Sequence, residues 1–185
     1  IMYLRSLHAR VFVNLLSGNL LDARKDVEKF NFVSKDCKFK TLEANSWCLR
    51  ENIALQLFDE DMVKHSFNSV RSFQGMLNYR MYFDALAGLI LYYSLKGNKK
   101  KIELLLLEMS DMASKLKDVR AKLFHESIKA RVNWHKGQGE KELPWAQTDW
   151  VKQSPTSYFF LMDVPSLTKI RIIISHGTIV QVEEV

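Results

Sequence analysis

The chain has 185 residues, 47% of them hydrophobic and 26% charged, with a formal net charge of +6. This length is sufficient for a sizeable apolar core, and no apolar run approaches the ~18 residues of a membrane-spanning helix, so no membrane partner is expected. The positive charge is diffuse, because its longest run is Lys99–Lys101 and no basic stripe or nucleic-acid motif accompanies it. We therefore expect no direct contact between this segment and nucleic acid.

Apolar residues at helical spacing predict helix after helix through the first two thirds of the chain. Three carboxylates at 59–61 favour a helix start there, because negative charge complements the helix dipole. The most apolar helix ends at Lys96-Gly97-Asn98, and the next one packs back against it. The predicted helices cover residues 2–17, 20–33, 36–57, 62–73, 79–95, 99–115 and 118–136.

The regular pattern fails in the segment 137–165. It contains two glycines and all three prolines of the chain, and prolines interrupt helices. We expect one short helix around 145–150 and then a loop or short helix that includes Tyr158. A last helix, 165–175, follows, and residues 178–185 begin its partner. Because Ile1 precedes Met2, we interpret the sequence as a fragment of a longer chain.

Glycines recur along the chain with a period of 40 residues. Gly18, Gly97, Gly137 and Gly177 each follow an apolar helical run, and Phe58 stands where the missing glycine would fall. Glycine closes helices in any helical protein, but a regular period of this size is typical of paired-helix repeats, whose units span about 34 to 47 residues.

Positions at fixed offsets from these marks are also similar. Five residues before each mark stand Val13, Ile53, Tyr92, Val132 and Ile172. Seven residues before each mark stand Val11, Glu51, Ile90, Ala130 and Ile170, a column in which Glu51 is the clear exception.

The period predicts an all-α fold. We expect a right-handed superhelix of antiparallel helix pairs, similar to tetratricopeptide repeats, that forms a single domain over 1–185. The first helix of each pair should end near residues 17, 57, 96, 136 and 176. One buried seam should contain Leu86, Leu89, Ile90, Tyr93, Ile102, Leu106 and Met109.

No pattern of catalytic or metal-binding residues is present. The five histidines are dispersed, the acids form no obvious pair, and no nucleophile elbow occurs. We therefore expect neither an enzyme nor a bound metal or cofactor. Cys37 and Cys48 lie too far apart along one predicted helix for a disulfide, which favours a reducing cytoplasm.

From residue 118 onward the chain contains a more specific pattern. The helix with Ala130-Arg131 leads to a lysine–glycine turn, Ala146 and Trp150 follow, and the last helix reads LTKIRIIISHG from Leu167. This pattern resembles the helical-repeat domain of the large LuxR-type transcriptional regulators related to the maltose-regulon activator. Ile170 stands where that family usually has alanine, and over 1–117 only the generic repeat supports the resemblance.

The resemblance implies a function. In that bacterial family the repeats lie between a nucleotide-binding module and a helix-turn-helix DNA-binding domain, and they relay an inducer or partner signal to oligomerisation. Neither flanking module is recognisable here, so DNA binding would fall outside this fragment. We expect a cytoplasmic sensor and interaction module that meets a protein or a small-molecule inducer and associates with itself. The alternatives are a tetratricopeptide-type scaffold that holds a peptide in its groove, and a helical lid of an enzyme.

The candidate ligand-binding residues lie in the same region. Arg131 and Arg171 share a phase on successive repeats, where two guanidinium groups suit a carboxylate or phosphate. The alternative is that each pairs with a neighbouring acid of the scaffold. Trp134, Trp150 and Tyr158 are candidates for a stacking platform, against the alternative that they are core residues.

Overall fold

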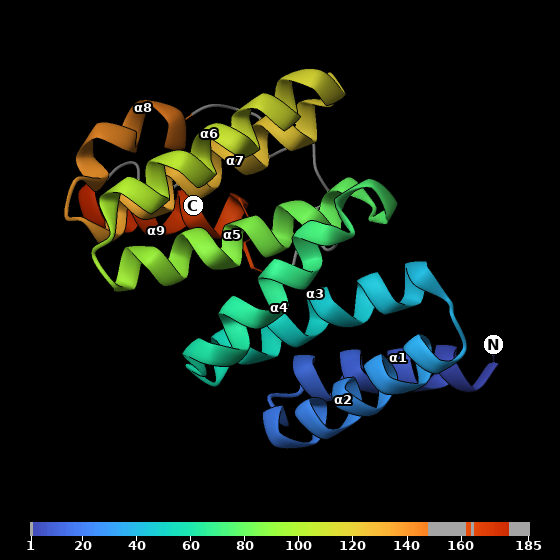
Figure 1. Cartoon of the computed structure of the whole chain (residues 1–185). Coiled ribbons are helices and arrows are strands. Elements are labelled where there is room, and N and C mark those ends of the chain that lie inside the picture. Colours follow the sequence, from blue (N-terminus) through green and yellow to red (C-terminus); the bar gives the residue numbers. More distant parts are fainter. Residues whose placement is uncertain (1, 148–161, 164, 178–185) are drawn as a thin grey trace. The chain divides into compact units, whose positions relative to one another are not determined.

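The computed structural model describes residues 2–147, 162–163 and 165–177. Within these ranges the chain is all-α and contains no strand (Figure 1). No helix in the described part is long and apolar enough to cross a membrane. In chain order the elements are α1 (Met2–Leu16), α2 (Leu20–Asp36), α3 (Lys40–Gln56), α4 (Glu60–Ser72), the 3-10 helix η1 (Gln74–Met76), α5 (Tyr79–Leu95), α6 (Lys99–Leu116), α7 (Val119–His135), the 3-10 helix η2 (Gly139–Glu142), α8 (Leu143–Ala146) and α9 (Pro165–His176).

The predicted ends of the first helices of each pair are confirmed. The odd-numbered helices α1, α3, α5, α7 and α9 end at Leu16, Gln56, Leu95, His135 and His176. The predicted start of the third helix at residue 36 is wrong, because α2 continues to Asp36 and Lys38 has a φ of 57°, so α3 begins only at Lys40. The predicted start of α4 is confirmed in detail, because Asp59 caps the helix by accepting a 3.0 Å hydrogen bond from the backbone N–H of Met62.

The glycine period marks a repeated way of ending a helix. Backbone φ is positive at Gly18, Gly97 and Gly137, and also at Phe58, where φ is 55°. At each of these four residues the following N–H donates to a carbonyl five residues back, for example Asp59 to Ala54 at 2.9 Å, which is the Schellman closure. Phe58 therefore occupies the missing position of the glycine series with the same backbone conformation. Lys38 closes α2 in the same way.

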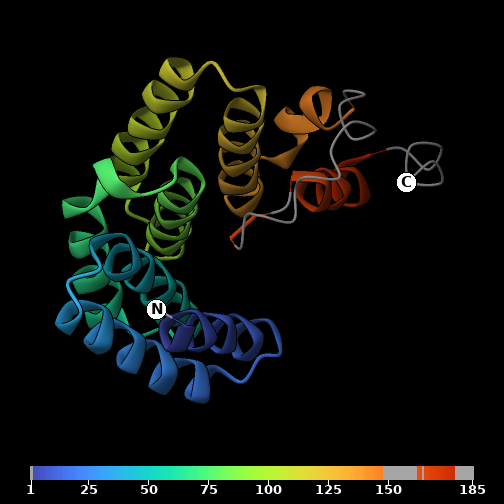
Figure 2. The ribbon, with the colours of Figure 1, turned by 90° about the vertical axis from the view of Figure 1, so that its right-hand side faces the viewer.

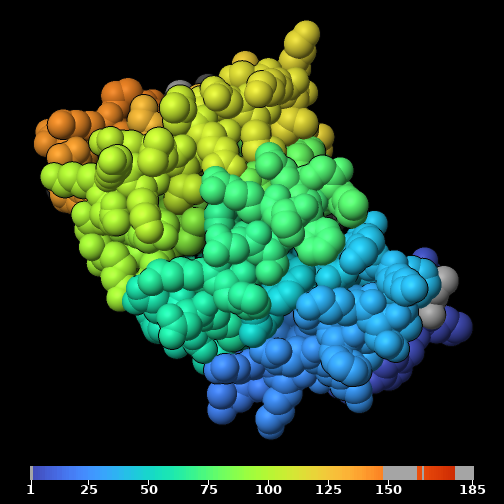
Figure 3. Space-filling model, in the orientation of Figure 1, coloured from blue at the N-terminus to red at the C-terminus, as the bar shows by residue number. Residues whose placement is uncertain are grey.

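The chain divides into two compact units, 1–89 and 90–185, which are described separately. In unit 1 the consecutive helices α1 to α4 run back and forth, each packed against the next, and α3 also contacts α1 (Figure 1). Side chains of α2 and α4 lie side by side on the face shown in Figure 3. The interior of this unit includes the fully buried residues Val11, Ala23, Val27, Phe30, Ala44, Ile53, Ala54, Val63, Val70, Phe83, Leu86 and Ala87.

In unit 2, α7 packs against α6, α9 and η2, and α8 packs against α9 (Figure 2). A small core of Ala130, Ala146, Ile172 and Ile173 joins α7, α8 and α9. Gly139 of η2 is required by the close approach of its neighbours, since a Cβ there would lie 2.6 Å from Nε2 of His176 and 2.9 Å from Cδ1 of Trp134. The second glycine of the irregular segment is thus explained by packing.

Burial is confirmed for five of the seven residues predicted to line one seam on α5 and α6, and the other two are only half-buried. Leu86, Leu89, Ile90, Ile102 and Met109 are buried, and Tyr93 is half-buried. Leu106 is only half-buried, whereas its neighbour Leu105 is buried. The buried face of α6 follows the spacing Ile102, Leu105, Met109 and Ala113, and Leu106 lies at the edge of this face.

Candidate functional site

Arg131, the first candidate residue, forms an ion pair with a buried acid of its own chain. Its Nη1 donates to Oδ1 of Asp163 at 3.2 Å and to the carbonyl oxygen of Met162 at 2.7 Å. The Asp163 side chain has 0% exposure, against 23% for Arg131. This is the arrangement of a scaffold arginine paired with an acid, although the contact commits only one of its terminal nitrogens.

Asp163 accepts further hydrogen bonds that hold α7 and α9 together. Ser127 Oγ of α7 donates to its Oδ2, and Thr168 Oγ1 of α9 donates to its Oδ1 at 2.7 Å. Both hydroxyls are buried with it. A buried carboxylate is tolerated when it is paired and hydrogen-bonded in this way. No sequence pattern had assigned Asp163 a role.

Arg171, the second candidate residue, is exposed on α9. His135, at the exposed end of α7, has a lowered pKa, because partial burial and the charges of Arg131 and Arg171 disfavour its protonated form. The charges of the two predicted arginines thus both act on His135, and their shared ligand site stays a prediction. His135 was missed, although its position four residues after Arg131 puts it on the same helix face.

Trp134 belongs mainly to the small core of unit 2. It is half-buried against the cluster of Ala130, Ala146, Ile172 and Ile173, and its indole N–H donates to Ser175 Oγ at 3.2 Å. Its ring centroid lies 5.1 Å from that of His135. Trp134 is therefore mainly a core residue, as the alternative interpretation held, and its ring also lies beside His135. Trp150 and Tyr158 lie outside the described residues, so their roles stay predictions.

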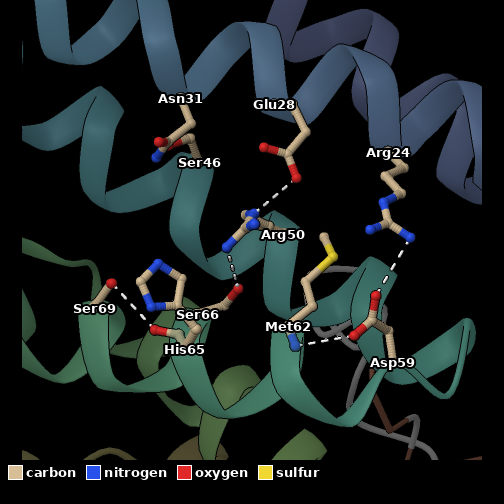
Figure 4. Close-up of polar contacts among 10 residues, drawn as sticks. All are labelled: Arg24, Glu28, Asn31, Ser46, Arg50, Asp59, Met62, His65, Ser66 and Ser69. Atoms are coloured by element: carbon tan, nitrogen blue, oxygen red, sulfur yellow. Dashed lines mark hydrogen bonds and ion pairs between the residues drawn. The ribbon is translucent and has the colours of Figure 1, made fainter.

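A second set of polar contacts joins three helices of unit 1 (Figure 4). Arg50 of α3 donates to Glu28 of α2 at 3.1 Å and to Ser66 of α4 at 3.3 Å, with its side chain only 16% exposed. Arg24 of α2 forms a 3.3 Å ion pair with Asp59, the cap of α4. Arg50 thus holds the helices on both sides of α3, a positioning role that the sequence analysis did not single out.

Trp47 lies beneath Arg50 in the same region. The guanidinium carbon of Arg50 lies 5.2 Å from the Trp47 ring centroid, and the His65 ring meets the indole edge-on at 5.2 Å. Trp47 is 7% exposed, so it is a core residue whose rim is covered by cations. These contacts stabilise the packing of α3 and α4 and leave little indole surface for a ligand.

The described residues contain no group of three His, Cys, Asp or Glu side chains with a geometry suited to a metal ion. Cys37 is an exposed free thiol and Cys48 a buried one. In comparisons with known proteins, no family model, no curated protein and no solved structure matches this chain. The resemblance to the LuxR-type regulators accordingly stays a prediction from the residues that suggested it.

Proposed function

We propose that this chain is a non-catalytic binding module whose basic cluster on α7 and α9, formed by Arg131, His135 and Arg171, receives an anionic ligand or an acidic partner. We further propose that the chain is the sensor and oligomerisation module of a bacterial LuxR-type regulator. The finer architecture, a right-handed superhelix of tetratricopeptide-like helix pairs, is part of the same proposal.

The observation that supports the proposal is the convergence of two arginines forty residues apart on one histidine. Both Arg131 and Arg171 lower the pKa of His135. Asp163 offsets the charge of Arg131, but no ion pair joins Arg171 to another described residue. Three cationic or potentially cationic groups from two helices therefore influence one another electrostatically, which suits recognition of a carboxylate or phosphate.

His135 makes the proposed affinity dependent on pH. The two arginines and burial disfavour its protonated form, so without an anion the imidazole is mainly neutral at neutral pH. A bound anion near the imidazole would offset the arginine charges and favour its protonation. By linkage, anion affinity should rise as the pH falls toward the pKa of His135.

The test is a calorimetric titration of the chain at pH 6 and pH 8 with inorganic phosphate and, separately, with an acidic peptide. The Arg171→Gln variant should lose at least tenfold in affinity for the ligand that binds. The matched control is Arg5→Gln, which removes an exposed arginine from α1. Equal affinity in wild type and Arg171→Gln, or no binding of either ligand to wild type, would contradict the proposed site.

The regulator context has a separate test. The gene that encodes this chain should also encode a helix-turn-helix domain on the carboxy-terminal side of Val185. Its absence would refute the LuxR-type context and leave the anion-binding proposal intact. Binding of the acidic peptide without binding of phosphate would favour the peptide-scaffold alternative.

A further inference from the structure

Glu51 occupies a position that the repeat reserves for apolar residues. The equivalent residues in three other helices, Val11, Ile90 and Ala130, are all fully buried. Glu51 is also 0% exposed. The exception in the sequence column is therefore a carboxyl group in the interior of unit 1, and local departures from a consistent pattern often mark functional positions.

Both Oε1 and Oε2 of Glu51 are buried, and neither has a hydrogen-bond partner among the described residues. A buried carboxylate without a donor or a cation is strongly disfavoured relative to the neutral acid. Most buried polar groups in proteins are hydrogen-bonded, so an unsatisfied one calls for an occupant or a protonated state.

A second carboxyl group and a thiol of the same unit interact electrostatically with Glu51. Asp84 of α5, 5% exposed, is the charged group that acts on it, and burial and Asp84 together raise its pKa well above the ordinary glutamate value. Cys48, about one turn earlier on α3, is buried, and burial with the charges of Glu51 and Asp84 raises its thiol pKa. The charges of these groups thus influence one another's pKa, and no cation of the described residues acts on Glu51.

Several charged side chains of the helices packed on α3 are engaged with groups other than Glu51. From α2, Glu28 accepts from Arg50, and Arg24 forms its ion pair with Asp59. From α4, the His65 ring lies against Trp47. From α1, Arg10 pairs with Asp26 of α2. A metal ion is not a suitable occupant, since no three ligating groups converge there within the described chain. A proton remains as the species that neutralises Glu51.

We propose that Glu51 is a proton-binding site in the core of unit 1, and that loss of its proton opens the packing of α3 beside the Asp84 turn of α5. The protonated acid fits among apolar neighbours, whereas the carboxylate requires water or a cation. Deprotonation therefore favours a state in which this turn of α3 reaches solvent. The chain would then sense pH, or any partner that binds the open state.

The direction of the pH dependence follows from linkage. In the unfolded chain Glu51 ionises near its ordinary pKa of about 4.3, whereas in the folded unit it retains its proton to a higher pH. Between these two pH values the folded state binds more protons. Its contribution to stability is therefore fully present below the unfolded pKa. Between the unfolded and the folded pKa, the equilibrium constant for folding falls about tenfold for each unit by which the pH rises.

The first experiment compares urea unfolding of the full chain, its Glu51→Gln variant and its Glu103→Gln variant between pH 6.5 and 9. Glu103 is an exposed glutamate of α6 and serves as the matched control. Wild type and Glu103→Gln should lose stability as the pH rises, and Glu51→Gln should be more stable than wild type at pH 8 with a flatter profile. An unchanged slope, or a Glu51→Gln chain less stable than wild type at pH 8, would overturn the proposal.

The second experiment uses Cys48 as a probe of opening, in a Cys37→Ser background that removes the exposed thiol. If modification by a disulfide reagent requires opening, its rate should rise about a hundredfold per pH unit, tenfold from the thiolate and tenfold from Glu51, and only about tenfold with Glu51→Gln. Equal slopes would overturn the proposal.

If Glu51→Gln fails to fold, carbon NMR of wild type decides. One glutamate carboxyl should stay protonated at a pH where the others have ionised. Ionisation of every glutamate near the ordinary value would refute the proposed site.

Discussion

Arg131 of α7 and Asp163, which precedes α9, form an ion pair whose acidic partner is completely buried, with 3.2 Å between Nη1 and Oδ1. The two residues are 32 positions apart, and the contact fastens the start of α9 to α7. It explains why a basic residue on α7 is compatible with a close approach of these helices.

We expect Asp163→Ala to lower the free energy of unfolding by about 3 kcal/mol, because it leaves Arg131, Ser127 and Thr168 without their shared acceptor. The measurement is urea unfolding followed by tryptophan fluorescence. Asp118→Ala provides the control for an ion pair of low value, since Asp118 pairs with the exposed Arg120, and should cost less than about 1.5 kcal/mol including the cap. Equal effects at the two positions would show that Asp163 is not an anchor.

Phe58 should be a site of stored backbone strain. Its φ is 55° and its exposure is 79%, so its left-handed conformation is not repaid by burial. We expect Phe58→Gly to raise the free energy of unfolding by about 0.5 kcal/mol, the relief of ~1–2 kcal/mol of strain less the entropy that glycine adds to the unfolded chain.

The control for Phe58 is Phe32→Gly, which replaces an equally exposed phenylalanine inside α2. It should lower the free energy of unfolding by about 1 kcal/mol, since glycine disfavours a helix interior. Thermal unfolding of both variants checks the contrast, and a destabilised Phe58→Gly variant would show that the ring makes an important contact.

The two faces of α6 should respond differently to truncation. Leu105 is 7% exposed and Leu107 is 61% exposed. Leu105→Ala should cost about 2–4 kcal/mol, because it removes buried methyl groups and leaves a cavity. Leu107→Ala should cost less than about 0.5 kcal/mol. Denaturant unfolding of the two variants compares them, and similar losses would mean that the outer face of α6 is also covered.

His135 should titrate at a higher pH when Arg171 is removed. Burial contributes most to its lowered pKa, followed by Arg131 and Arg171. Arg171→Gln removes one positive charge and should raise the pKa of His135, whereas Arg5→Gln should leave it unchanged. Proton–carbon NMR of the imidazole measures both variants. An unchanged pKa in Arg171→Gln would separate Arg171 from the basic cluster.

The lowered pKa of His135 also has a consequence for stability. The folded state disfavours protonation, so the unfolded state binds more protons between the folded pKa and the ordinary value of about 6.5. Stability contributed by the neutral imidazole is thus present above pH 6.5 and is lost as the pH falls through that window. This dependence is opposite to that expected for Glu51.

The forty-residue spacing was sufficient to predict the ends of α1, α3, α5, α7 and α9. Gly18, Gly97 and Gly137 adopt left-handed backbone conformations, which glycine does without a Cβ penalty. The positions of these glycines in the sequence therefore indicate directly where the helices end. Lys38 and Lys117 adopt the same conformation without being glycine. Nothing in their side chains signals it, which is why the start of α3 was placed too early. The phase of the repeat also pointed to Arg131 and Arg171, whose charges both act on His135.

Only the tertiary structure decided which residues of each helix are buried and which side chains pair. Helical periodicity does not distinguish Leu105 from Leu106 at the edge of an apolar face, since the neighbouring helices determine which is buried. The pairing of Arg131 with Asp163 joins residues on either side of the irregular segment and depends on how α9 packs against α7. The sequence also marked Glu51 as an exception among the apolar residues at its repeat position. Its burial, the lack of a donor to its carboxyl group among the described residues and the effect of Asp84 depend on groups distant in the chain, so only the packed interior shows them.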